Sequence, residues 1–143
     1  MLTIIVPVYN EKKFIRVLLK KLIKIIKIKK QIIIIDDGAS DGTTEILKKE
    51  FVNNKSISKI IFHKKNTGKG SAIRSAQRFI KGDFVVIQDA DLEYNPKDYL
   101  RLIKPITEGK ADVVYGSRFV GGGGDAHRVL YFWNRVANAI LTT

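Results

Sequence analysis

The sequence predicts an α/β protein in which helices cover both faces of a mostly parallel central sheet, giving three layers. Short apolar runs alternate along the chain with longer segments of helical periodicity, which is the order from which parallel sheets are built. The apolar runs are nearly continuous, as expected of strands that are buried on both faces. A length of 143 residues, of which 45% are apolar, fits one domain spanning residues 1–143.

The first half of the chain is expected to form three strands and two helices. The expected strands are Leu2–Val6, Gln31–Ile35 and Ile57–His63. A helix over Lys12–Lys27 follows from one stripe of apolar residues spaced four apart, namely Phe14, Leu18, Leu22 and Ile26. A second helix reaches about Phe51, and either Asp41 or Thr43 can cap its start.

The second half continues the same alternation. We expect a helix over Lys69–Ile80, a strand over Phe84–Ile87 and a helix that starts near Pro96 and reaches Ile106, since proline suits a first helical turn. Asp112–Tyr115 is predicted to be a fifth strand, and the chain is expected to be helical from Ala126 onward.

Charge, cysteine content and hydropathy limit the class of protein. The net charge of +12 favours polyanionic partners, namely nucleic acid, an anionic membrane surface or phosphorylated substrates, unless it reflects a general bias toward lysine. The absence of cysteine excludes a disulfide scaffold and a thiolate metal site. No signal peptide is expected, and no apolar run approaches the roughly 20 residues of a membrane span. The expected location is cytoplasmic, either soluble or peripheral at the cytoplasmic face of the membrane.

Polar clusters follow the predicted strands and indicate one site. They are Tyr9–Glu11, Asp36–Asp41, Asn66–Gly70, Asp89–Glu93 and Ser117–Arg118. The carboxyl ends of parallel strands meet at one edge of an open sheet, and ligands bind at that edge. The sequence therefore predicts a binding site built from these five clusters.

Asp89 and Asp91 are the best candidates for metal ligands. Alternate residues at the end of an extended strand point to the same side, about 7 Å apart, and Glu93 continues the pattern. Carboxylate oxygens are the ligands that Mg2+ and Mn2+ take in proteins, with substrate phosphates completing the shell. The alternative interpretation is a polar turn between a strand and a helix.

Two further clusters suit a nucleotide. Acids within Asp36–Thr43 can accept hydrogen bonds from a base or ribose, and the glycines there allow close backbone approach. The alternative interpretation is a turn with a helix cap. Capping does not need Asp36 or Asp37, so at least one of these two acids is still expected to be functional. Asn66–Ser71 suggests a phosphate-binding helix start, although it matches neither the P-loop nor the dinucleotide fingerprint. His63, just before this cluster, is interpreted as a strand residue.

The segment from Gly116 to Arg128 predicts a cationic loop, or else a plain solvent loop. It contains Arg118, a run of glycines and Arg128. An arginine guanidinium fits a phosphate with two parallel hydrogen bonds.

Five motifs occur together in the order typical of family 2 glycosyltransferases. They are Val6–Glu11, Asp36–Thr43, Asn66–Gly70, Asp89–Asp91 and Gly116–Phe119. The chain most resembles the dolichyl-phosphate mannose and glucose synthase branch and its bacterial polyprenyl-phosphate relatives. This resemblance covers nearly the whole chain and implies the GT-A fold, a Rossmann-like three-layer sandwich. Family members continue well past residue 143, so the resemblance also implies a domain that is incomplete at its C-terminus.

The resemblance assigns roles to residues of the five motifs. Those implied to bind the nucleotide sugar are Pro7, Tyr9, Glu11, Asp36, Asp37, Lys69, Asp89 and Ala90. Asp89 and Asp91, with Glu93, are implied to hold the donor diphosphate through Mg2+ or Mn2+. Ser117, Arg118 and Arg128 are implied to receive the acceptor phosphate, and Asp91 and Arg118 to be catalytic.

The implied reaction is an in-line, inverting transfer of a hexose from a UDP- or GDP-sugar to a polyprenyl phosphate. A phosphate acceptor is already anionic at neutral pH and needs no general base. A nucleotidyltransferase also uses paired carboxylates, but it would usually carry a Gly-rich first loop, where this chain has Pro7–Glu11. A nucleic-acid-binding module is disfavoured because acids cluster where an RNA backbone would be repelled. A fragment that binds the donor without turnover is a further alternative, and the oligomeric state is left unknown.

Overall fold

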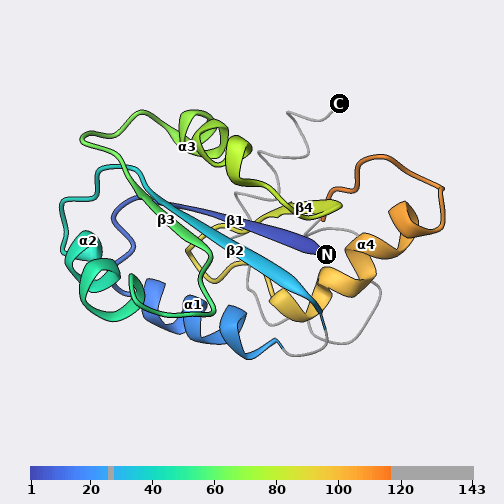
Figure 1. Ribbon diagram of the computed structural model, residues 1–143, viewed down its shortest axis with the longest axis horizontal. Helices are drawn as coiled ribbons and strands as arrows, with labels where there is room; N and C mark the ends of the chain where they lie inside the picture. Colours follow the sequence, from blue (N-terminus) through green and yellow to red (C-terminus); the bar gives the residue numbers. More distant parts are fainter. Residues whose placement is uncertain (26–27, 117–143) are drawn as a thin grey trace, which may run out of the picture.

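The computed structural model describes residues 1–25 and 28–116, which contain a four-stranded parallel sheet (Figure 1). The strands are β1 (Leu2–Val8), β2 (Lys30–Asp36), β3 (Lys59–Phe62) and β4 (Phe84–Ile87). Their order across the sheet is β3-β2-β1-β4. β1 pairs in parallel with β2 on one side and with β4 on the other, so it lies inside the sheet.

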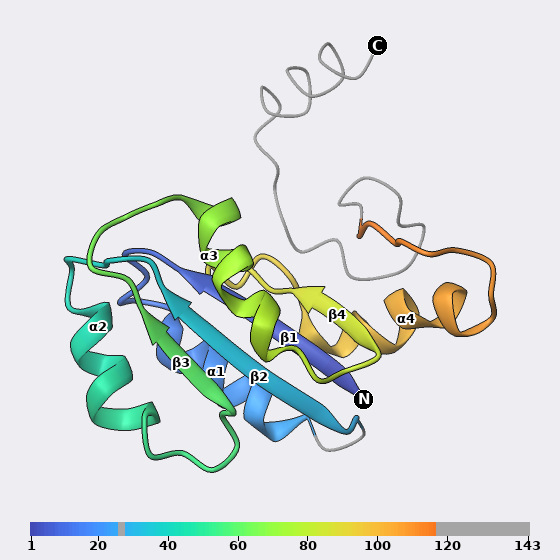
Figure 2. The same ribbon diagram turned by 45° about the horizontal axis from the view of Figure 1, so that its top comes forward.

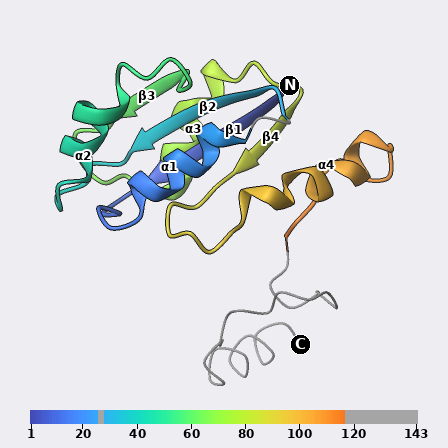
Figure 3. The same cartoon turned by 90° about the horizontal axis from the view of Figure 1, so that it is seen from below.

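Helices lie on both faces of this sheet. They are α1 (Ile15–Lys24), α2 (Thr43–Ile46) with its π-helical continuation η1 (Leu47–Phe51), α3 (Lys69–Ala76) with the 3-10 turn η2 (Gln77–Phe79), and α4 (Tyr99–Thr107) after the 3-10 turn η3 (Pro96–Asp98). α1, α2 and α4 cover one face and α3 lies on the other (Figure 2 and Figure 3). The predicted three-layer α/β arrangement is confirmed. None of the helices within residues 1–25 and 28–116 is long and apolar enough to cross a lipid bilayer.

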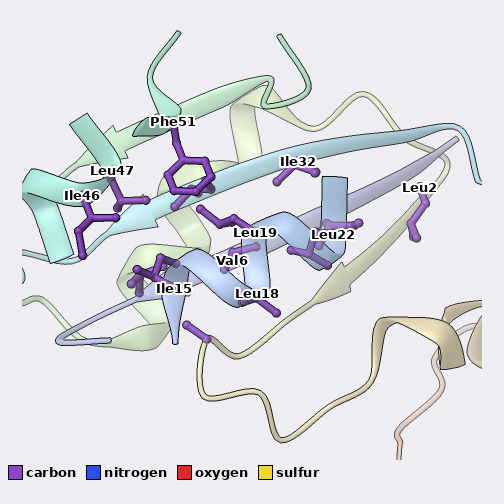
Figure 4. Close-up of a cluster of buried hydrophobic side chains, with 14 of the residues drawn as sticks. Leu2, Val6, Ile15, Leu18, Leu19, Leu22, Ile32, Ile46, Leu47 and Phe51 are labelled. Carbon is purple, nitrogen blue, oxygen red and sulfur yellow. The ribbon is translucent and has the colours of Figure 1, made fainter. Parts of the chain in front are cut away.

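The larger hydrophobic core lies between the sheet and the helices α1, α2 and α4 (Figure 4). Strand residues and helix residues meet there in one cluster, which includes Leu2, Ile4, Val6, Ile15, Leu18, Leu19, Leu22, Ile32, Ile34, Ile46, Leu47, Phe51 and Tyr99. α1 buries one side of its surface and carries basic residues on the other. Burial of this amphipathic stripe fixes α1 against the sheet.

A smaller core forms on the opposite face of the same strands. Ile5, Ile33 and Ile35 pack there against Ala72 and Ala76 of α3. Successive strand residues point to opposite faces, so β1 and β2 are buried on both sides, which explains their continuous apolar runs. The alanines let the α3 backbone lie close to the sheet.

The order of the strands reverses between β1 and β4. The chain runs from β1 through α1 to β2, but it runs from β3 through α3 to β4 on the other side of β1. Parallel strands are joined by right-handed crossovers, so connections in opposite directions place their helices on opposite faces. The loop after β1 therefore leads to α1 on one face, and the loop after β3 leads to α3 on the other. Open α/β sheets bind ligands at the carboxyl ends of the strands where the strand order reverses, which here are β1 and β4.

Most of the predicted helices and strands are present, but the residues at which they begin and end differ from the prediction. α1 begins at Ile15 where the prediction began at Lys12, and Phe14 is 39% exposed instead of belonging to the buried stripe. β3 is shorter than the predicted strand. The predicted capping of α2 by Asp41 or Thr43 is wrong, because its N-cap is Gly42 without a side-chain capping hydrogen bond. The Asp41 carboxylate instead accepts a hydrogen bond from the N–H of Thr43, the first residue of the helix.

The predicted fifth strand over Asp112–Tyr115 is wrong. A strand forms only where a neighbouring strand pairs with its backbone groups, and no strand in the described ranges pairs with this segment. The side chains of Val113 and Tyr115 are 64% and 90% exposed. The helix predicted from Ala126 lies outside the described residues.

Replacement of Leu19 by alanine tests the packing of α1. Leu19→Ala should lower the free energy of unfolding by about 2–5 kcal/mol, because Leu19 is fully buried and the smaller side chain leaves a cavity. The matched control, Val17→Ala, lies on the exposed side of the same helix and should change it by less than about 1 kcal/mol. Urea unfolding followed by circular dichroism measures both, and equal losses would contradict this orientation of α1.

Candidate functional site

A cavity of about 300 Å³ lies at the carboxyl ends of the strands, in the crevice between β1 and β4. Its walls come from the ends of β1, β2 and β4 and from the start of α3. The lining residues are Pro7, Val8, Tyr9, Glu11, Asp37, Asn66, Gly68, Lys69, Ala72, Asp89, Ala90 and Asp91. Four of the five predicted polar clusters therefore contribute to one cavity.

The loop after β1 brings Tyr9 and Glu11 to the cavity. Asn10, between them, has a left-handed backbone with φ of 55°, and its side-chain oxygen accepts a hydrogen bond from the N–H of Ser40. Asparagine adopts this conformation more readily than most residues. The N–H of Glu11 donates to Thr43 Oγ1 at 3.0 Å. The loop is thereby fixed to the start of α2.

Asp36 serves the loop that leads into α2. Its carboxylate accepts hydrogen bonds from the N–H of Ala39, at 3.0 Å, and from the hydroxyl of Thr44. The side chain is buried and is absent from the cavity lining. The predicted contact of Asp36 with a nucleotide sugar therefore has no support in the geometry, and the turn interpretation accounts for this residue.

Asp37 lines the cavity with both carboxylate oxygens already bonded to protein donors. Oδ1 accepts from the hydroxyl of Thr67 at 2.7 Å and lies 2.7 Å from His63 Nδ1, while Oδ2 accepts from the N–H of Gly68 at 2.8 Å. Burial alone would raise the pKa of Asp37, but the hydrogen bonds from His63, Thr67 and Gly68 outweigh it and lower the pKa below its ordinary value. Asp37 thus holds the loop that leads into α3.

Gly38 lets this loop approach the end of β2 closely. Its φ is +73°, and a Cβ at this position would lie 2.5 Å from the carbonyl carbon of Lys65 and 2.7 Å from the nitrogen of Asn66. Glycine meets both the backbone angle and the lack of space. The close approach expected at this motif is therefore between two protein backbones.

Lys69 and Asp89 form an ion pair between α3 and the end of β4. Lys69 Nζ lies 2.5 Å from Asp89 Oδ1, and the two side chains are 56% and 30% exposed. An ion pair with this exposure contributes only about 0–1 kcal/mol to stability. A ligand that offers either group a stronger partner can therefore break it.

The backbone that carries Asp89 is fixed by a buried hydrogen-bond chain. The hydroxyl of Tyr99 donates to Gln88 Oε1 at 2.6 Å, and Gln88 Nε2 donates to the carbonyl oxygen of Asp89 at 2.9 Å. Burial raises the pKa of Tyr99, which keeps its hydroxyl protonated as a donor. α4 therefore helps to place the acidic end of β4.

The chain turns sharply after Asp91. Leu92 has a left-handed backbone with φ of 64°, which is uncommon for a bulky residue, and the N–H of Glu93 donates to Asp91 Oδ1 at 2.9 Å. Asp91 lines the cavity and Glu93 does not. The extended strand ends at Ile87, and residues 90–91 form a turn, so the alternation on which the prediction of Glu93 as a ligand rested is absent.

The cavity carries an excess of negative charge. Burial raises the pKa of Glu11, and the charges of Asp91, Asp41 and Asp89 raise it further. Within residues 1–25 and 28–116, no three acidic or histidine side chains are grouped as a metal site, so the predicted trio of Asp89, Asp91 and Glu93 is not assembled. Two carboxylates still suit Mg2+ or Mn2+ where ligand phosphates complete the shell.

The structure brings most of the predicted site residues together. Those that line the cavity are Pro7, Tyr9, Glu11, Asp37, Lys69, Asp89, Ala90 and Asp91. Ser117, Arg118 and Arg128 lie outside the described residues. Sequence reasoning missed the contact of His63 with Asp37, for which the only signal was a histidine three residues before Asn66.

Comparison with known proteins identifies a family that this chain matches over most of its length. The profile of Glycosyl transferase family 2 matches residues 3–142. The chain is 32% identical over 122 residues to a dolichol-phosphate mannosyltransferase of Pyrococcus furiosus, covering 85% of this chain and 34% of that protein. It is 36% identical over 110 residues to an undecaprenyl-phosphate 4-deoxy-4-formamido-L-arabinose transferase of Edwardsiella ictaluri, covering 75% and 34%.

A solved structure shares the fold. A mannosyltransferase from Pyrobaculum calidifontis, in complex with GDP-Man and Mn2+, superposes with a TM-score of 0.60 at 26% identity, covering 69% of this chain and 30% of that one. The GT-A fold implied by the resemblance is confirmed by this likeness. The chain spans about a third of the length of these relatives, 34% in both curated proteins.

The lowered pKa of Asp37 predicts how stability depends on pH. A carboxyl group with a lowered folded-state pKa stabilises the protein above its unfolded pKa, about 3.9, and this contribution is lost as the pH falls through the folded value. Asp37→Asn should cost about 1–3 kcal/mol near pH 7, and the gap to the wild type should narrow below about pH 4.

Urea unfolding between pH 7 and pH 3 measures this gap. The control is Asp112→Asn, a change at an exposed aspartate outside the cavity, which should follow the wild type throughout. A gap that stays constant across this range would contradict the role of Asp37.

Proposed function

This chain belongs to glycosyl transferase family 2, and we propose that it forms the donor-binding part of a metal-dependent, inverting glycosyltransferase. The proposed reaction moves a hexose from a UDP- or GDP-sugar to a polyprenyl phosphate. Support for this acceptor comes from the two curated relatives, whose names specify a dolichol phosphate and an undecaprenyl phosphate.

The observation that carries the proposal is the meeting of Lys69, Asp89 and Asp91 in one cavity at the crevice between β1 and β4. A nucleoside diphosphate sugar needs a cationic group for its phosphates and carboxylates for a metal ion. Lys69 is the first residue of α3, so the diphosphate would also meet the N–H groups of a helix start. Pro7 and Tyr9, at the end of β1, would form the wall beside the nucleotide.

Asp89 and Asp91 are the residues proposed to hold Mg2+ or Mn2+. Their carboxylate oxygens suit these hard cations. A cation there would relieve the repulsion from Asp89 and Asp91 that adds to burial in raising the pKa of Glu11. When bound, the metal would neutralise the charge that develops on the leaving diphosphate. Of the solved structures with this fold, the Pyrobaculum calidifontis mannosyltransferase is described with GDP-Man and Mn2+.

The proposed displacement needs little acid–base chemistry from the chain. An oxygen of the acceptor phosphate bonds to the anomeric carbon, the bond from that carbon to the diphosphate breaks, and the electron pair leaves with the diphosphate. Lys69 would bind the departing phosphate and Asp91 would keep it in line. Ser117, Arg118 and Arg128 are proposed to receive the acceptor phosphate on the basis of the resemblance alone.

A donor-binding fragment without turnover is the second candidate. It is considered because the cavity formed by the described residues supplies groups for the donor alone, and the match covers 34% of each of the two polyprenyl-phosphate relatives. Donor binding is common to both candidates, so binding is the property to test first.

Titration calorimetry with UDP and GDP, each with and without Mn2+, tests the donor site. We expect one nucleotide to bind in the presence of Mn2+ and Asp91→Ala to weaken that binding by at least about tenfold. The control variant Asp112→Ala lies outside the cavity and should bind as the wild type does. Failure of the folded wild type to bind either nucleotide would refute the donor site.

We also propose that α1 contacts an anionic membrane surface. Arg16, Lys20, Lys21 and Lys24 lie on its exposed side, and the helix carries no acidic residue. Phe14 and Val17 are partly exposed beside them. Basic residues near an anionic bilayer contribute about 1 kcal/mol each, and a lipid-linked acceptor would require such proximity.

Co-sedimentation with phosphatidylglycerol vesicles tests this contact. Changing Lys20, Lys21 and Lys24 together to glutamine should weaken vesicle binding on the order of a hundredfold, given about 1 kcal/mol for each lysine. Changing three exposed lysines on other elements, Lys55, Lys97 and Lys110, serves as the matched control. Equal losses in both triple variants would show that overall charge, and not α1, binds the vesicles.

A further inference from the structure

His63 lies just after β3 and connects three parts of the chain. Its backbone N–H donates to the carbonyl oxygen of Asp36 at 2.8 Å, which extends the pairing of β3 with β2. Its ring reaches Asp37, Thr67 and Ser75. The side chain is 16% exposed and does not line the cavity.

The contact with Asp37 defines which ring nitrogen carries a proton. Nδ1 lies 2.7 Å from Asp37 Oδ1 and 3.1 Å from Thr67 Oγ1. An ionised carboxylate only accepts hydrogen bonds, so Nδ1 is protonated and donates to Asp37. The hydroxyl proton of Thr67 is itself donated to Asp37, so the Thr67 oxygen can share the same Nδ1–H.

The other ring nitrogen connects His63 to α3. Nε2 lies 2.9 Å from Ser75 Oγ, in the second turn of the helix. In the neutral ring with Nδ1 protonated, Nε2 accepts the hydroxyl proton of Ser75, for which the carbonyl oxygen of Ser71, 3.1 Å from Ser75 Oγ, is the competing acceptor. The neighbouring residues Ala72 and Ala76 pack against the sheet. One imidazole therefore joins the end of β2, the loop before α3 and α3 itself.

We propose that His63 is a positioning residue for donor binding. Its protonated Nδ1 donates to Asp37 and orients this carboxylate, which in turn holds the N–H groups of Thr67 and Gly68. These N–H groups belong to the loop that delivers Lys69 and the start of α3 to the cavity. The inference rests on the proposed function, because it takes the cavity as the donor site. His63 acts through Asp37, since its own ring does not line the cavity.

Removal of the imidazole should loosen this loop without unfolding it. Asp37 keeps the hydrogen bonds from Thr67 and Gly68, so the loop retains anchors of its own. Asp37 loses the hydrogen bond from His63 Nδ1, and the loop loses its connection to α3 through Ser75. A misplacement of about 1 Å in a site can cost about a hundredfold in function, so binding is more sensitive than folding.

Calorimetry on a set of variants tests the affinity. With Mn2+ and whichever of UDP or GDP the wild type binds, His63→Ala should weaken binding about 10–100-fold. His63→Asn should recover most of the loss, because an asparagine amide N–H can replace Nδ1–H. Ser75→Ala keeps the Asp37 contact and should cost less than about threefold. Unchanged affinity in His63→Ala, or equal weakening in the alanine and asparagine variants, would overturn the inference.

Two NMR measurements on the unliganded protein are independent of nucleotide binding. The chain has two histidines, so a His127→Gln background leaves one imidazole, whose nitrogen shifts should show a protonated Nδ1. The amides of Thr67 and Gly68 should exchange with solvent about tenfold faster in His63→Ala than in the wild type, and at close to the wild-type rate in His63→Asn. The amides of Ile33 and Ile34 in β2 serve as internal controls.

These measurements separate failure of the inference from failure of the proposed function. An unprotonated Nδ1, or unchanged exchange at Thr67 and Gly68, would overturn the role of His63. If exchange accelerates as expected but the wild type binds neither nucleotide, His63 still positions the loop and the donor-site assignment is refuted.

Discussion

Parallel pairing of β1 on both of its edges is the constraint on which the rest of the structure depends. β1 lies between β2 and β4, so its side chains are buried on both faces and are mostly apolar. Its one buried hydroxyl, that of Thr3, donates to Gln31 Oε1 at 2.8 Å. The reversal of strand order at β1 sends α1 and α3 to opposite faces of the sheet. The cavity lies where the strand order reverses, at the carboxyl ends of β1 and β4, which is the edge at which open α/β sheets bind ligands.

The acids at this edge fall into two groups with different physical situations. Asp36, Asp37 and Asp41 accept hydrogen bonds from protein donors and thereby shape the loops. Glu11 and Asp91 line the cavity close enough for the charge of one to raise the pKa of the other. The first group stabilises the frame, and the second leaves negative charge directed at the cavity, where a cation is the natural complement.

The sequence could predict the strands, the layers and the edge at which polar residues gather, because burial on both faces and parallel topology leave direct patterns in the chain. It could not predict what each acid contacts. Asp37 and His63 meet only because β2, β3 and the loop before α3 converge, which is a tertiary event. Glu93 was assigned by extended-strand alternation, but β4 ends at Ile87, and the chain then turns through the left-handed Leu92. Asp112–Tyr115 has the composition of a strand, but pairing depends on a neighbour and not on composition.

The strengths of the interactions around the cavity differ in a way that suits ligand exchange. The bonds to Asp37 are buried and charge-assisted, so breaking them would leave an unpaired carboxylate at substantial cost. The Lys69–Asp89 ion pair is partly exposed and contributes little. A phosphorylated ligand with a metal ion could therefore replace the second without disturbing the first. On the proposed function, donor binding would exchange one weak ion pair for two stronger partnerships, Lys69 with phosphate and Asp89 with the metal, inside a frame that stays fixed.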